Sequence, residues 1–133
     1  MPLRVAVASR NAELNVISTN LDNGFLRIYS GAQPATPETA ASGTLLAELR
    51  FNVDAFPAAV AGVLTANAMT PDAAANATGV AGWARALGAD GTTAVLDTNV
   101  SVVGGGAPLE LDSINLEVGA DVVVDSFTLT LPM

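Results

Sequence analysis

Short segments in which apolar and polar side chains alternate follow one another after Phe25, separated by glycine and proline. In residues 44–51, for example, the apolar side chains share one face, whereas Glu48 and Arg50 share the other. Side chains alternate between the two faces of a sheet, so this pattern is typical of a half-buried strand. Strands are therefore predicted over residues 25–30, 44–51, 62–68, 83–87, 93–99, 109–112, 114–118 and 122–131.

Glycine, proline and aspartate mark the connections between these segments. Asp90-Gly91 predicts the tight turn of a hairpin, because this dipeptide readily takes the positive φ values that such turns require. Gly104-Gly105-Gly106-Ala107-Pro108 is predicted to be a flexible connection. In the last strand the alternation changes phase near Asp125 or Ser126, which predicts a β-bulge. The alanine-rich stretch 53–82 lacks an apolar stripe and contains prolines, so it is predicted to form loops around one short strand.

One helix is predicted over residues 10–23, before the first strand. Ser9 or Asn11 is expected to cap its start, and Asn23-Gly24 supplies the left-handed stop at which helices often end. The side chains expected to face the rest of the domain are Leu14, Ile17 and Leu21. Because this stripe is narrow, the helix is predicted to lie on the surface of the domain.

These elements predict a mainly β fold, a β-sandwich or jelly-roll-like single domain with one N-terminal helix. At 133 residues the chain has the usual size of one domain, and no internal repeat or domain boundary is found. The predicted organisation is an N-terminal arm at residues 1–9, the helix at 10–23 and a β domain at 25–133.

The charge of the chain excludes several classes of partner. Thirteen acidic residues face five arginines, there is no lysine, and the net charge is −8. Nucleic-acid binding draws its affinity from basic groups, so neither nucleic acid nor an anionic membrane surface is an expected partner. No apolar stretch approaches the roughly 20 residues needed to span a bilayer.

The residue types needed for most catalysis are missing from the sequence. Without histidine, lysine or cysteine there is neither a base for a serine or threonine nucleophile nor an imidazole or thiolate metal ligand. The carboxylates lie at turns or on the polar faces of strands, so a solvated surface is favoured over a glycosidase pair or a calcium site. No enzymatic activity, cofactor or metal is therefore expected.

The run from Leu26 to Leu49, which contains Gly31-Ala32-Gln33-Pro34, resembles a family of small proteins encoded by tailed phages and prophages. The similarity extends over nearly the whole chain. The further segments that carry it are Arg10-Asn11-Ala12, Val63–Ala68, Trp83-Ala84-Arg85 with Asp90-Gly91, and Ser126–Pro132.

This resemblance implies a bacteriophage virion structural protein. A decoration or cement protein fits best, one that binds the major capsid protein on the outer shell and stabilises the capsid after assembly in the host cytoplasm. Two alternatives remain open: a neck or tail component of the virion, and a carbohydrate-binding module for host attachment. A sugar-binding module requires exposed aromatic rings, whereas most aromatic residues here fall beside aliphatic residues on strand faces, apart from Tyr29, which lies close to the proline-rich loop.

The arm is the predicted contact with a partner. Apolar side chains alternate with other side chains along the arm, so it can add a strand to a sheet edge of a neighbouring subunit. Equally, the arm can be an edge strand of its own domain. The assembly is expected to be a homotrimer, with arginines of this region paired to carboxylates of the shell. The predicted contact residues are Leu3, Arg4, Val5, Val7 and Arg10.

Overall fold

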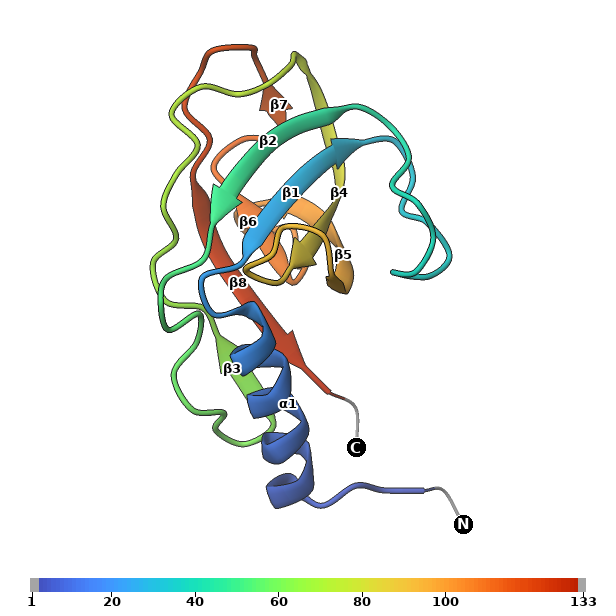
Figure 1. Ribbon diagram of the computed structural model, residues 1–133, viewed down its shortest axis with the longest axis vertical. Helices are drawn as coiled ribbons and strands as arrows, with labels where there is room; N and C mark the ends of the chain where they lie inside the picture. The colour runs from blue at the N-terminus through green and yellow to red at the C-terminus, as the bar shows by residue number, and fades with distance from the viewer. Residues whose placement is uncertain (1–2, 132–133) are drawn as a thin grey trace.

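The computed structural model describes residues 3–131 and shows a mainly β domain with one helix (Figure 1). The predicted fold class is confirmed. Helix α1 (Val7–Leu21) comes first in the chain. The strands are β1 (Phe25–Ser30), β2 (Leu45–Arg50), β3 (Val63–Thr65), β4 (Gly79–Leu87), β5 (Ala94–Val102), β6 (Leu109–Leu111), β7 (Asn115–Leu116) and β8 (Val124–Thr130).

The strands of the described chain form one sheet in the order β2-β1-β4-β5-β6-β8-β3, with β7 paired to the start of β4. Neighbouring strands are antiparallel except β5 and β6. The sheet curls into a half-barrel (Figure 1). Helix α1 lies at one end of the half-barrel, against β3 and β5.

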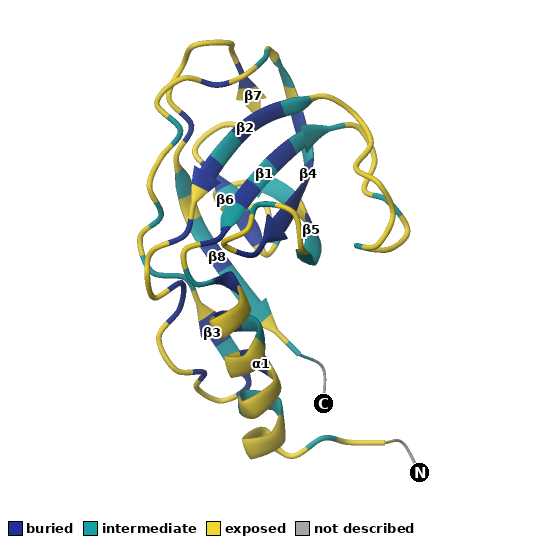
Figure 2. Cartoon of the chain, in the orientation of Figure 1, coloured by how far each residue is buried: buried dark blue, intermediate teal, exposed yellow. Residues whose placement is uncertain are grey.

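The inward face of the curled sheet carries the hydrophobic core (Figure 2). Leu26 of β1 lies in register between Leu49 of β2 and Ala86 of β4, and all three side chains are buried. Beside this layer, three buried phenylalanine rings pack together: Phe51, Phe56 and Phe127. The half-barrel therefore has one continuous core, as a single domain of this size requires.

An irregular segment, residues 70–76, covers the free edge of β2. Thr70 exchanges two backbone hydrogen bonds with Arg50, at 3.3 and 2.9 Å, and Asp72 exchanges two with Val122, at 3.1 and 2.8 Å. Further along, the backbone N–H of Asn76 donates to the carbonyl of Leu46 at 2.8 Å. The segment thus links β2 to the residues before β8, and it hides an edge that could otherwise pair with another chain.

Helix α1 begins at Val7, so the predicted start at Arg10 was wrong. Ala6 precedes the first turn and no side chain caps it, which also excludes Ser9 as the N-cap. The side chain of Asn11 does not cap the helix either, because it accepts a hydrogen bond from the backbone of Gly62. At the other end, Asn23 has a φ of 58°, which confirms the predicted left-handed stop.

A row of polar side chains on α1 holds the loop of residues 55–62. The backbone N–H groups of that loop donate to Asn11, Asn15 and Asp22 at 2.8, 2.9 and 2.8 Å, and Ser18 donates to a loop carbonyl at 3.5 Å. These four residues recur at the spacing of one helix face. A surface helix is usually attached to its domain by a stripe of apolar side chains. In α1 these hydrogen bonds take over part of that role.

Replacing Asn15 by Ala is expected to lower the free energy of unfolding by about 1–3 kcal/mol, because the N–H of Ala59, which lies at a buried residue, loses its acceptor. Urea denaturation of the variant measures the loss. The matched control is Asn20→Ala, an exposed position of the same helix. Both changes raise helix propensity equally. Equal stability of the two variants would contradict the role assigned to Asn15.

The predicted hairpin and bulge are both present. Gly91 takes a φ of 71° in the turn between β4 and β5, and the carboxylate of Asp90 accepts the backbone N–H groups of Thr92 and Thr93, each at 2.9 Å. These bonds, with the one from the Thr93 hydroxyl, hold the pKa of Asp90 well below its usual value. In β8, the register against β6 shifts so that Asp125 is left without an opposite residue.

The parallel pairing of β5 with β6 was not predicted. A connection of residues 103–108 brings the chain back to start β6 beside the end of β5, with Val100 opposite Leu109. Gly104 and Gly106 have φ values of 84° and 88°, which other residues rarely adopt. Parallel strands usually need a connection of a dozen residues or more, and this return is shorter because only three residue pairs form.

Candidate partner-binding site

The segment predicted to contact a partner leaves the start of α1 in an extended form. Leu3 to Ala6 belong to no helix or strand and pair with no strand of the described chain. Leu3 is 87% exposed and Arg4 is exposed, whereas Val5 is half-buried. Val7, predicted to be part of the extended arm, is the first residue of α1 instead and is 45% exposed.

Arg10 contacts its own chain. Its Nε donates to the carbonyl of Val5 at 3.2 Å, and its guanidinium lies against Gly62, where a Cβ atom would come within 2.6 Å of Nη1. Gly62 has a φ of 77°, a backbone conformation that favours glycine there. Arg10 therefore fixes the direction in which Leu3 to Ala6 leave the helix.

A narrow apolar opening, the β5–β8 slot, lies between β5 and the end of β8. It has a volume of about 240 Å³. The side chains of Leu14 and Ile17 on α1 line it together with residues of both strands. Its lining consists of Leu14, Ile17, Leu96, Asp97, Thr98, Pro108, Thr128, Leu129, Thr130 and Leu131.

The slot exists because β6 is short. On its side away from β4, β5 pairs only through Val100–Val102, so the described chain supplies no strand partner there to residues 94–99. On the β6 side of β8, the ladder ends at Phe127. Pro108 stands directly before β6 and lacks the N–H that a longer strand would need. Two sheet edges therefore face each other without a strand between them.

The outward face of the sheet carries a row of charges that the sequence analysis did not single out. In register across four strands lie Glu48, Arg27, Arg85 and Asp97. Arg85 donates to Asp97 from Nε at 2.8 Å and from Nη2 at 3.0 Å, and both side chains are over 90% buried. The hydrogen bond to Asp97 raises the pKa of Arg85 above its usual value.

The loop of residues 31–43 contacts the buried end of this charge row, at Arg85. Nη2 of Arg85 also donates to the carbonyl of Thr39 at 2.7 Å. Next to it, Trp83 is fully buried and stacks on Tyr29 with 4.7 Å between ring centroids. Within residues 3–131, its Nε1 has no hydrogen-bond partner. A sequence signal for the ion pair existed, because a hairpin centred on Gly91 places residue 85 opposite residue 97.

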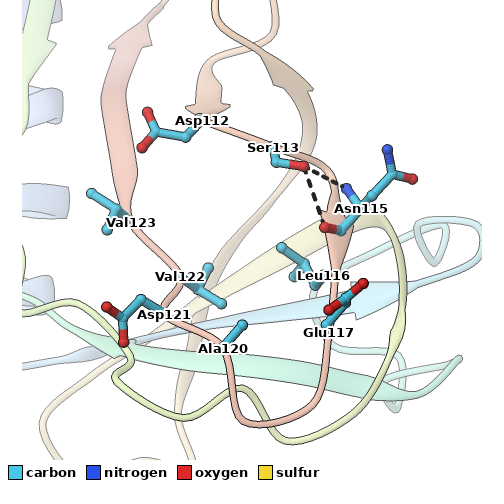
Figure 3. A pocket seen from close by; sticks show the side chains of 9 residues that line it. All are labelled: Asp112, Ser113, Asn115, Leu116, Glu117, Ala120, Asp121, Val122 and Val123. Atoms are coloured by element: carbon cyan, nitrogen blue, oxygen red, sulfur yellow. Dashed lines mark hydrogen bonds between the residues drawn. The ribbon is translucent and has the colours of Figure 1, made fainter.

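An acidic hollow of about 330 Å³ lies near β7 (Figure 3). Asp112, Glu117 and Asp121 stand at separate places on its rim (Figure 3). In residues 3–131 no three acidic side chains are grouped so as to hold a metal ion. The described part of α1 is also neither long nor apolar enough to cross a membrane.

Comparisons with family models, with curated proteins and with solved structures find no match for this chain. The function is therefore argued from the residues and the geometry described above.

Proposed function

We propose that the protein is a bacteriophage virion structural protein, a decoration or cement protein that binds the major capsid protein on the capsid exterior and associates with its own copies as a trimer. The observation that carries the proposal is the extended segment Leu3 to Ala6. It displays apolar side chains outside a folded domain, as attachment segments of assembling proteins do. The resemblance of residues 26–49 to small phage proteins agrees with this role.

Two properties of the domain suit an outer position on a shell. Its net charge of −8 gives no attraction to packaged nucleic acid. The edge of β2 is covered by residues 70–76, so the sheet does not offer that edge to other proteins. Contacts repeated around a symmetric shell can add up to tight attachment even when each is weak.

Binding to purified shells that lack the protein tests the proposal. The full chain is expected to bind at many sites, in a fixed ratio to the major capsid protein, and to raise the temperature at which the shell disrupts. Deletion of residues 2–5 is expected to abolish binding while the circular dichroism spectrum is retained. The measurement is co-sedimentation with quantitative gel analysis, followed by electron cryo-microscopy of the decorated shells.

The same experiment separates the other virion role. Density confined to one vertex, with few copies per particle, would contradict a decoration protein and favour the neck or tail component. Absence of any binding to the particle would overturn the proposal altogether. The sugar-binding alternative is not carried further, because each of the six aromatic side chains is buried or half-buried.

A further inference from the structure

We propose that Leu3 to Ala6 of one copy enters the β5–β8 slot of a second copy as an added strand. This inference deepens the proposed function, because it names the contact through which copies of the protein associate. Only the place of that contact, the capsid surface, rests on the proposed function. Three features carry it: the unpaired backbone on both sides of the slot, the fit of apolar side chains, and the charges of the two surfaces.

The backbone of the slot is prepared for a strand. Residues 94–99 of β5 form one wall and Thr128–Thr130 of β8 form the other. The backbone N–H of Thr128 donates to the carbonyl of Pro108 at 2.9 Å, whereas β6 pairs with neither residues 94–99 nor Thr130. Unpaired N–H and C=O groups along a sheet edge bind an extended segment through main-chain hydrogen bonds. A strand entering here would continue the line of β6 and complete the sheet.

The apolar side chains of the segment match the slot in size and spacing. Leu3 and Val5 are two residues apart, so in a strand they point to the same side, about 7 Å from each other. The slot offers the half-buried side chains of Ile17 and Leu96 to receive them, with the fully buried Leu14 beneath. Its volume of about 240 Å³ lies below the roughly 300 Å³ from which small-molecule pockets usually begin, so a few aliphatic side chains fit it better than a ligand does.

The charges of the two surfaces are complementary. Between Leu3 and Ser9 the only charged residue is Arg4, so the segment is cationic, whereas the chain as a whole has a net charge of −8. Glu13 is exposed on α1 next to the slot residue Leu14. Asp90 lines a hollow that adjoins the slot through Ile17. These carboxylates favour the approach of an arginine-bearing segment.

A second copy is the expected donor because of how the segment leaves its own helix. The bond from Arg10 to the Val5 carbonyl holds the segment at the start of α1. Seven residues of helix, about 10 Å, separate Val7 from Leu14 in the slot. Figure 1 shows the segment running sideways from the start of α1, which is the end of the helix farther from the half-barrel.

Disulfide trapping between two single-cysteine variants tests the inference, and the absence of native cysteine makes the product unambiguous. Leu3→Cys protein is mixed with Thr130→Cys protein under mild oxidation, without capsids. A mixed disulfide dimer is expected to form at least about tenfold faster than in the control mixture, because docking raises the effective concentration of the two thiols. The control replaces Thr130→Cys by Val118→Cys, an exposed position in the turn after β7.

Equal rates for the two mixtures would overturn the inference. An intrachain disulfide in the double variant Leu3→Cys/Thr130→Cys, without mixed dimers, would also overturn it, because the segment would then occupy the slot of its own chain. Capsid binding that persists without cross-linking would leave the decoration role intact and reject only the slot. Cross-linking without capsid binding would support the slot contact and reject only the decoration role.

Sedimentation equilibrium gives a second measurement that does not depend on cysteine. Val5→Asp is expected to weaken self-association by at least about tenfold, since it removes one buried aliphatic side chain from the contact and places a charge there. The matched control is Val16→Asp, at an exposed position of α1 that does not line the slot. Equal association of the two variants would contradict the inference.

Discussion

Replacement of Asp97 by Ala is expected to lower the free energy of unfolding by about 3–5 kcal/mol, because the buried guanidinium of Arg85 is then left without its carboxylate. Asp97 is bonded to both Nε and Nη2 of Arg85, and the two side chains are only 2% and 9% exposed. A domain of this size has a total stability of about 5–15 kcal/mol. The variant should therefore unfold at much lower urea concentration.

The control for this prediction is the second ion pair of the same charge row. The Nε atom of Arg27 lies 2.6 Å from Oε2 of Glu48, but the two side chains are 29% and 37% exposed. Water solvates a charge that remains at such an exposed site, so Glu48→Ala is expected to lower the free energy of unfolding by less than about 1 kcal/mol. The double variant Arg85→Met/Asp97→Leu, which removes both buried charges, should recover most of the loss. Similar losses of stability in Asp97→Ala and Glu48→Ala would contradict the larger contribution expected from the buried ion pair.

Replacement of Phe127 by Ala is expected to lower the free energy of unfolding by about 3–5 kcal/mol, because it leaves a cavity in the packed core. Phe127 is 1% exposed, and its ring centroid lies 6.1 Å from that of Phe51 and 5.9 Å from that of Phe56. Thermal and urea unfolding of the variant measure the loss. The residue also sits in β8 opposite Leu109, so the pairing of β8 with β6 should weaken as well.

Phe25→Ala removes the same atoms from a different environment and serves as the control. Phe25 is half-buried on the outward face of β1, where the guanidinium of Arg50 lies 4.4 Å from its ring centroid. The loss there is expected to be clearly smaller, since less apolar surface returns to water and no closed cavity forms. If the two variants lost equal stability, the Phe127 ring would not have the core role described.

The alternating pattern predicted where strands occur, because the rule behind it is local, but several bounds were wrong. Strand β4 begins at Gly79, inside the stretch predicted to form loops, and β7 spans only Asn115–Leu116. The first strand was predicted with its observed bounds, and the bulge near Asp125 was confirmed. The helix start was wrong because an apolar segment such as residues 3–8 fits a strand and a helix equally. In the structure Val7 to Ser9 belong to the helix, and the backbone N–H of Arg10 donates to the carbonyl of Ala6 at 3.0 Å to close its first turn.

Of the two surfaces in the proposed contact, only the extended segment could be proposed from the sequence. The extended segment could be proposed from its own residues, but the slot could not, because its walls come from β5 and β8 and its remaining lining from α1. The parallel return from β5 to β6, which opens the slot, depends on how Pro108 and the glycines before it fold in three dimensions. Patterns read along one segment contain no information on such pairings.

The partner of β3 has a consequence for the order of events during synthesis. Strand β3 pairs with β8 through Val63–Thr65 and Thr128–Thr130, so β3 must wait for β8, more than 60 residues later, to leave the ribosome. The hairpin of β4 and β5 can form before then, whereas the loop around β3 stays open and exposes apolar surface. A nascent chain stalled before β8 should therefore bind holdase chaperones and be cleaved by proteases within residues 53–78, and release of the last strand should end both.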